Sequence, residues 1–136
     1  MTVAARILLV EDNPANLELV SYLLEAAGHA VLIAEDGQQA LELASRAPFP
    51  DLIVSDLRMP VMDGFEMLRH IRAHETLRDI PIIAVTAFSM SGDQTRVMLA
   101  GFDGYISKPI DPETFVSEVE AYLRAGRRKA GPVADE

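Results

Sequence analysis

Five short aliphatic runs alternate along the chain with longer segments in which apolar positions recur at helical spacing. Four of the runs are continuously apolar, which is typical of parallel strands covered by helices on both faces. The fifth, around Tyr105 and Ile106, is a weak strand pattern on its own. The predicted strands are Arg6–Val10, Ala30–Ala34, Asp51–Ser55, Pro81–Val85 and Gly104–Ser107.

The segments between the strands carry signals for helix starts and ends. Asn13 can cap the first helix, with Pro14 at its first position, and Gly28 can end it. The fourth helix opens with Ser91 and Gln94 at the spacing of a capping box. The other helices are predicted to start near Gln38, near Gly64 and, with Asp111 as cap and Pro112 as first residue, at the last segment.

This alternation predicts an α/β fold, a (βα)5 doubly wound five-stranded parallel sheet. The 136 residues fit one compact domain. We expect residues 1–125 to form that domain and residues 126–136 to form a polar, flexible tail. Too few residues follow Leu123 to form an effector domain, so we expect any output to pass through surface contacts.

Charge and composition argue against several functional classes. Twelve basic residues against 21 acidic ones give a net charge of −9, which opposes nucleic-acid binding. The basic cluster near the C-terminus is typical of a solvated helix end. The chain has no cysteine, which excludes disulfides and thiolate metal sites. The apolar stretch Ile7–Val10 is too short for a signal peptide or membrane span, and we expect a cytoplasmic location.

Polar residues follow the predicted strands on the side where ligands bind in open parallel sheets. Glu11 and Asp12 follow the first strand, and Asp56 follows the third. Thr86 follows the fourth strand and Lys108 the fifth. Any one of them could be a solvated loop residue. All five together predict a single site at one edge of the sheet.

The residue types at this edge fit phosphoryl transfer. Crowded carboxylates repel one another, and a divalent cation relieves that repulsion. Oxygen-only ligands favour Mg²⁺, with Mn²⁺ as an alternative ion. A carboxylate nucleophile, Asp56, would accept the phosphoryl group. Lys108 would offer a positive charge and Thr86 a hydroxyl donor to the phosphoryl oxygens.

Four short motifs stand in a fixed order on these elements: Glu11-Asp12, Asp56–Gly64, Thr86-Ala87 and Lys108-Pro109. None is specific alone, but together they resemble the receiver domains of bacterial response regulators over residues 5–124. The stretches 85–93 and 105–110 look especially like single-domain cell-division regulators and the receivers of hybrid histidine kinases. The resemblance implies a flavodoxin-like, CheY-like sheet with strand order 2-1-3-4-5.

The resemblance also implies a metal-ligand set. In the family pattern, Asp12, Asp56 and the backbone carbonyl of Arg58 bind Mg²⁺. Glu11 would act mainly through a metal-bound water. The pattern also places a cis peptide bond at Lys108-Pro109, which would aim the lysine inward.

A conformational switch is implied as well. The family couples Thr86 to an aromatic on the fifth strand, here Tyr105, and the response alters the surface of the fourth helix, fifth strand and fifth helix. Tyr105 could otherwise be an ordinary half-buried strand aromatic. Arg58 and Phe88 occupy positions thought to tune dephosphorylation, and we expect the bulky Phe88 to hinder the approach of water.

The implied function is that of a phospho-acceptor signalling protein in a two-component system or phosphorelay, rather than an enzyme. Its partners would be a sensor histidine kinase or a histidine phosphotransfer protein, and a downstream target protein. No nucleic-acid or membrane partner is expected. The protein would be a monomer or a phosphorylation-promoted dimer, and it could end the signal or relay the phosphoryl group onward.

Two other classes stay open. A phosphohydrolase with an aspartyl nucleophile usually needs a second acid two residues on, where this chain has Arg58. A pseudo-receiver, an interaction module that is never phosphorylated, is disfavoured by the intact acidic residues, threonine and lysine. His70 and His74 stand four residues apart on a predicted helix, but without a third ligand nearby they are better explained as solvent-facing.

Overall fold

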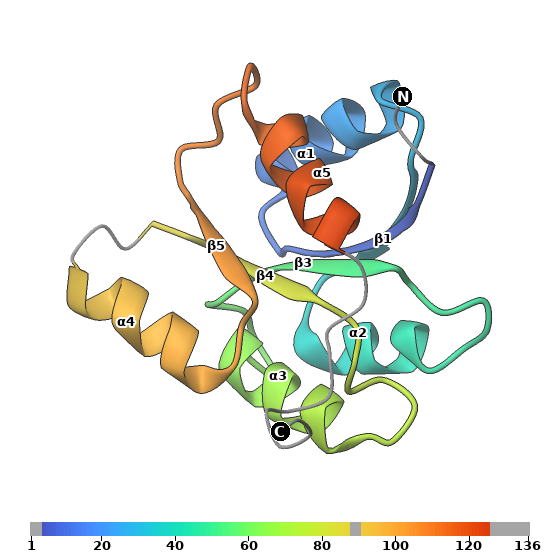
Figure 1. Ribbon diagram of the computed structural model, residues 1–136, viewed down its shortest axis with the longest axis vertical. Helices are drawn as coiled ribbons and strands as arrows, with labels where there is room; N and C mark the ends of the chain where they lie inside the picture. Colours follow the sequence, from blue (N-terminus) through green and yellow to red (C-terminus); the bar gives the residue numbers. More distant parts are fainter. Residues whose placement is uncertain (1–3, 88–90, 126–136) are drawn as a thin grey trace.

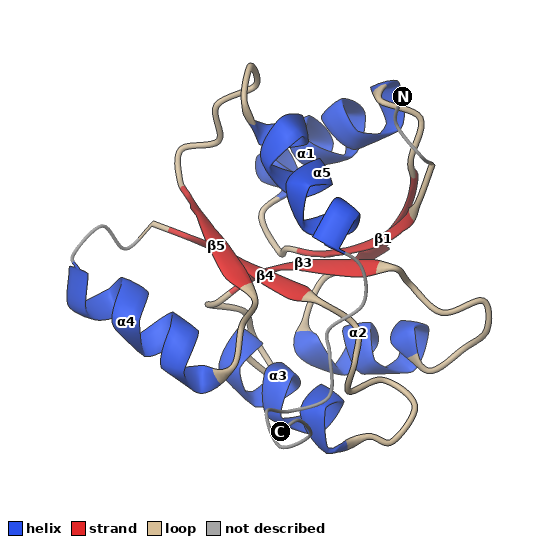
Figure 2. Cartoon of the chain, viewed as in Figure 1, coloured by secondary structure: helices blue, strands red, loops and turns tan. Residues whose placement is uncertain are grey.

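Strands and helices alternate throughout the computed structural model, which describes residues 4–87 and 91–125. The strands of this described part form one parallel sheet in the order β2-β1-β3-β4-β5. Figure 1 follows the chain through the sheet, and Figure 2 distinguishes its strands from its helices. The strands are β1 Arg6–Val10, β2 Ala30–Ala34, β3 Leu52–Asp56, β4 Ile82–Thr86 and β5 Gly104–Ser107. The predicted fold class and strand order are confirmed.

Helices cover both faces of the sheet, as the continuous apolar strands require. α1 and α5 lie on one face, and α2, α3 and α4 lie on the other (Figure 1). The helices are α1 Pro14–Ala26, α2 Gly37–Ala44, α3 Gly64–Ala73, α4 Ser91–Ala100 and α5 Phe115–Ala125.

Two hydrophobic clusters, one on each face, form the core. Successive residues of a strand point to opposite faces, so Leu8 joins the cluster under α2 and α3 while Leu9 joins the cluster under α1 and α5. The second cluster is completed by Val20 and Leu24 of α1 and by Phe115 of α5. Asp56 and Thr86, the polar residues that end β3 and β4, lie at the edge of this core.

Side-chain caps fix where three of the helices begin. Asn13 caps α1 as predicted, its Oδ1 accepting the Asn16 N–H at 3.1 Å. Asp36 and Asp63 cap α2 and α3 in the same way, each accepting an N–H three residues on at 2.9 Å. These two caps were not predicted from the sequence. α1 ends at Ala26, and Gly28 follows with the positive φ of +96° that a glycine tolerates there.

Some predicted boundaries were wrong by a few residues. β3 and β4 end one residue later than predicted, because their ladders continue through the pairs Asp56 with Val85 and Thr86 with Ser107. α5 begins at Phe115, not at residue 112, because residues 112–114 form a turn.

Asp111 closes that turn before α5. Its carboxylate accepts the Glu113 N–H and its carbonyl accepts the Phe115 N–H, each at 2.9 Å. Asp111 therefore supports the start of α5, although it lies one turn before Phe115, the first residue of that helix.

Three predictions fall on parts of the chain outside the described residues: the role of Phe88, the Ser91 side chain in a capping box, and the tail at 126–136. Among the helices that the structure describes, none combines the length and the apolar character needed to cross a membrane.

Candidate functional site

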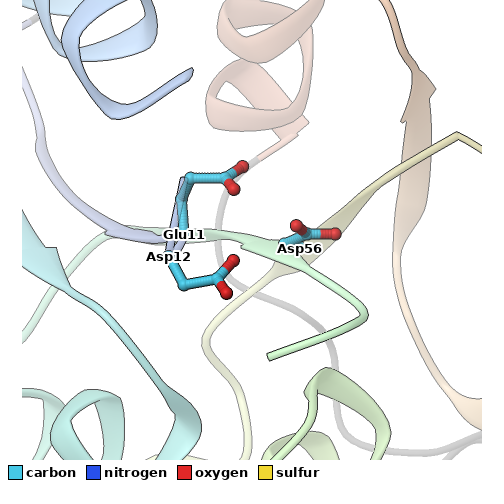
Figure 3. A group of neighbouring side chains, drawn as sticks. All are labelled: Glu11, Asp12 and Asp56. Carbon is cyan, nitrogen blue, oxygen red and sulfur yellow. The ribbon is translucent and has the colours of Figure 1, made fainter. Parts of the chain in front are cut away.

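Three carboxylates meet at the carboxyl edge of the sheet. Glu11 and Asp12 follow β1, and Asp56 ends β3. One oxygen from each of the three lies within 4.8 Å of the others, and Figure 3 shows the side chains converging on one space. Glu11 is buried, with 4% of its surface exposed, whereas Asp12 is open to solvent. The site thus has one shielded wall and one accessible wall.

Backbone donors hold two of these carboxylates in place. Glu11 Oε2 accepts the N–H of Asn13, the residue that caps α1, at 3.1 Å. Asp56 Oδ1 accepts the N–H of Leu57 at 2.7 Å. The start of α1 and the loop after β3 therefore fix the directions in which these carboxylates point.

Lys108, after β5, extends its ammonium toward the same space. Its Nζ lies 3.1 Å from Asp56 Oδ2 and 3.6 Å from Glu11 Oε1. Its backbone N–H donates to the Thr86 carbonyl at 2.8 Å, which ties the β5 end to the β4 end. The Lys108–Pro109 peptide bond is cis, as the family resemblance implied.

The electrostatics of the cluster favour a cation. Burial raises the pKa of Glu11 above its ordinary value of 4.5, the Asn13 N–H lowers it, the charge of Asp56 raises it again, and Lys108 lowers it. A single ammonium faces three carboxylates, so negative charge remains in excess. Carboxylate oxygens on both a buried and an open wall form a donor set that fits Mg²⁺.

A cavity of about 260 Å³ opens beside the carboxylates. It is lined by Asp56, Arg58, Thr86 and Lys108, together with Leu57 and Ala87. Thr86 is buried, and Arg58 is exposed at the rim. The structure thus brings four of the predicted site residues into one cavity, with Glu11 and Asp12 next to it.

Tyr105 lies on the same face of the sheet as Thr86. It pairs in register with Ala84, two residues before Thr86 on β4, and side chains two residues apart on a strand share a face. Tyr105 is half-buried and packs against the cluster that contains Val97 of α4. Its ring therefore lies in the layer that joins the sheet to α4.

Gly64 contributes to the site in a way that the sequence motif did not make explicit. Its N–H donates to the Leu57 carbonyl at 2.9 Å, which closes the loop after β3. A Cβ at this position would lie 2.5 Å from the Asp56 carbonyl oxygen and 3.1 Å from Leu57 Cα. Only a glycine lets α3 begin so close to the end of β3.

His70 of α3 and His74, which follows the helix, do not belong to a metal-binding group within the described part of the chain. Within the described residues, the acidic trio alone brings three or more suitable metal ligands together. His74 Nδ1 accepts the Thr76 N–H at 3.1 Å, so it serves the turn after α3.

Comparison with known proteins places this geometry in context. The response regulator receiver domain family matches residues 7–120. The polar-differentiation response regulator DivK of Brucella ovis is 42% identical over 117 residues, which cover 86% of this chain and 94% of DivK. DivK of Brucella anthropi is 41% identical over 117 residues, which again cover 86% of this chain and 94% of DivK.

Solved structures agree with the sequence comparisons. The chemotaxis response regulator CheY4 of Vibrio cholerae has a TM-score of 0.81 and 34% identity, covering 88% of this chain and 98% of CheY4. The receiver domain of a sensor histidine kinase from Pseudomonas aeruginosa has a TM-score of 0.80 and 37% identity. The match covers 90% of this chain and 99% of that receiver domain. That receiver was solved with a magnesium ion coordinated in its active site cleft.

Proposed function

The chain belongs to the response regulator receiver domain family, whose members are signalling phospho-acceptors, and from this premise we propose that it is a single-domain response regulator phosphorylated on Asp56 in a Mg²⁺-dependent reaction. The observation that carries the proposal is the position of Asp56 Oδ2, which lies 3.1 Å from the Lys108 ammonium and lines an open cavity. A nucleophile, a positive charge and room for a tetrahedral group occur together there.

Asp56 acts as the nucleophile. One of its carboxylate oxygens forms a bond to phosphorus while the bond between phosphorus and the donor's histidine nitrogen breaks. Asp12, Asp56 and the carbonyl of Arg58 would hold the Mg²⁺, and Glu11 would bind it mainly through a water molecule. When bound, the ion neutralises charge on the phosphoryl oxygens. The magnesium ion in the Pseudomonas aeruginosa receiver supports this metal assignment.

Lys108 and Thr86 receive the transferred group. The ammonium exchanges its contact with Asp56 for a phosphoryl oxygen, and the buried Thr86 hydroxyl donates to another. Turning Thr86 toward the phosphoryl group frees space on its face of the sheet, which Tyr105 fills. The surface of α4, β5 and α5 changes as a consequence.

The donor we propose is a sensor histidine kinase or a histidine phosphotransfer protein, and the output is a contact with a target protein, with relay of the phosphoryl group as the alternative. We propose that the receiver domain spans residues 1–125 and that residues 126–136 lie outside it. The protein promotes its own phosphorylation and dephosphorylation, has no nucleic-acid or membrane partner, and works in the cytoplasm as a monomer or a phosphorylation-promoted dimer.

The test is phosphorylation by a small donor. The full chain is incubated with acetyl phosphate and Mg²⁺, and the product is mapped by mass spectrometry. We expect an acid-stable, base-labile adduct on Asp56 that disappears in Asp56→Asn and persists in Asp79→Asn, which makes the same change away from the site. Labelling that persists in Asp56→Asn would overturn the proposal. Turnover without a lasting adduct would favour a phosphohydrolase, and no adduct from any donor or kinase would favour a pseudo-receiver.

A further inference from the structure

A second opening, larger than the phosphoryl cavity, lies between β5 and α5. It has a volume of about 550 Å³, which is in the range of clefts that bind ligands or partner side chains. β5 lies at the edge of the sheet between α4 and α5 (Figure 1), and this groove lies on its α5 side. Tyr105 and Tyr122 contribute to its walls.

The charged side chains that line the groove are both carboxylates. Asp111 stands before α5, and Glu118 lies on its first turn. Neither forms a salt bridge within the described part of the chain. Two basic side chains of the described part of the chain are paired with other carboxylates. Lys108 contacts Asp56 and Glu11, and the buried His29 faces Glu120 at 2.9 Å.

Tyr122 gives the groove an aromatic wall. Its ring lies directly on Gly104 of β5, and a Cβ added at Gly104 would collide with the ring. Burial raises the pKa of Tyr122 above its ordinary value of 10.0, and the negative charge of Glu118 raises it further. The groove therefore combines uncompensated negative charge with aromatic surface, which is the chemistry that attracts a cation.

We propose that the groove between β5 and α5 binds a segment of a partner protein through its arginine or lysine side chains. An anionic partner would be repelled by Asp111 and Glu118. A purely apolar partner would cover both carboxylates without pairing them, which is unfavourable. A cationic segment pairs with both carboxylates and lays its aliphatic stem along Tyr122.

This inference rests on the proposed function in one respect, because Tyr105 is the switch residue and also lines the groove at the edge strand β5, although its ring packs toward α4. A movement of Tyr105 on phosphorylation would alter the groove and so couple partner binding to Asp56. The acidic groove itself is present in the unphosphorylated structure.

The experiment uses the full, isotopically labelled chain and a short peptide of alternating leucine and arginine. A matched peptide carries neutral citrulline in place of arginine. We expect the arginine peptide to shift backbone amide NMR signals of β5 and α5, and the citrulline peptide to bind about tenfold or more weakly. Signals that shift elsewhere on the chain, or equal binding of the two peptides, would overturn the proposal.

Two pairs of substitutions separate the groove from the overall acidity of the chain. Asp111→Asn with Glu118→Gln should weaken binding of the arginine peptide about tenfold or more. The amide that Asp111→Asn introduces keeps an oxygen that can accept the Glu113 N–H, so the turn before α5 is preserved. Glu25→Gln with Glu75→Gln removes the same charge at exposed positions outside the groove and should leave binding unchanged. Equal weakening by both pairs would mean that only net charge attracts the peptide, which overturns the proposal.

The same samples keep this inference distinct from the proposed function. Asp56 labelling by acetyl phosphate tests the phospho-acceptor, and peptide binding to the unphosphorylated chain tests the groove. If Asp56 is labelled but the peptide does not bind in the groove, this inference alone is overturned. Peptide bound in the groove without any labelling supports this inference and overturns the proposed function alone.

Discussion

Lys108 Nζ lies 3.1 Å from Asp56 Oδ2, although 52 residues separate the two in the sequence. The contact forms because β3 and β5 flank β4 in the sheet and their carboxyl ends point the same way. The ammonium therefore occupies the position where negative charge would accumulate on an incoming phosphoryl group.

Replacing Lys108 with glutamine should slow phosphorylation of Asp56 by acetyl phosphate by about a hundredfold, because a preorganised charge at the reacting group is lost. Single-turnover labelling at saturating Mg²⁺ measures the rate. Lys129→Gln, which changes the net charge equally, should behave as the wild type. A Lys108→Gln rate equal to the wild-type rate would contradict the role given to this side chain.

Magnesium should stabilise the folded chain through the acidic trio. At ten times its dissociation constant, the ion should add about 1.4 kcal/mol to the free energy of unfolding, because it binds the folded state only. Urea unfolding with Mg²⁺ and with a chelator measures the difference. The gain should shrink in Asp56→Asn and Asp12→Asn and remain in Asp79→Asn. An undiminished gain in both site variants would show that the ion binds elsewhere.

Gly64→Ala should disturb the phosphorylation loop, because the new Cβ would press against the Asp56 carbonyl, which is backbone and cannot turn away. We expect a loss of about 1–3 kcal/mol in the free energy of unfolding together with slower labelling of Asp56. Gly28→Ala is the matched control. A Cβ at position 28 would meet open space, but the backbone there has a positive φ. Gly28→Ala should therefore lower the free energy of unfolding by about 1 kcal/mol and leave labelling of Asp56 unchanged.

The fold and most of the site could be predicted because they depend on local patterns. A strand covered on both faces needs a continuous apolar run, and the first polar residues after such runs mark the sheet edge. Asp56 and Thr86 could be placed at this edge from such runs alone, whereas Lys108 follows the weaker pattern of the fifth strand. This logic placed two strand ends one residue early, because an apolar run does not reveal that Asp56 and Thr86 still pair across the sheet.

Features that depend on packing could not be predicted in this way. Tyr122 fits the helical spacing of a buried stripe with Phe115 and Val119, yet it is only half-buried and lies on Gly104. The groove beside it exists because of how α5 sits on β5, which no spacing reveals. The caps Asp36 and Asp63, in contrast, have a local sequence signal, because each is an acidic residue directly before a glycine and a helical segment.

Arg72 joins three segments at the opposite edge of the sheet from the acidic trio. Its guanidinium donates to the Ile80 carbonyl at 2.8 Å, the Gly101 carbonyl at 3.2 Å and Asp103 Oδ2 at 2.7 Å. Arg72→Lys should lower the free energy of unfolding by about 2 kcal/mol, because an ammonium cannot reproduce this planar set of donors. Arg69→Lys, at an exposed position of the same helix, is the control. Equal urea midpoints for the two variants would contradict the prediction.

The stability of the chain at alkaline pH should depend on Tyr122. Burial, followed by the charge of Glu118, raises the pKa of this phenol above 10.0, so the folded chain holds the proton more tightly than the unfolded chain does. The free energy of unfolding should therefore fall as pH rises above 10.0 and continue to fall until the folded-state pKa is passed.

Tyr122→Phe has no proton to lose at this position, so its stability should fall less steeply across the same alkaline range, measured by urea unfolding at a series of pH values. Glu118→Gln should also flatten the fall, because it removes a charge that opposes ionisation. Tyr22→Phe, at a residue that is 68% exposed, should keep the wild-type slope. If Glu118→Gln instead kept the full wild-type slope, the negative field in the groove between β5 and α5 would be too weak to attract a cationic partner segment.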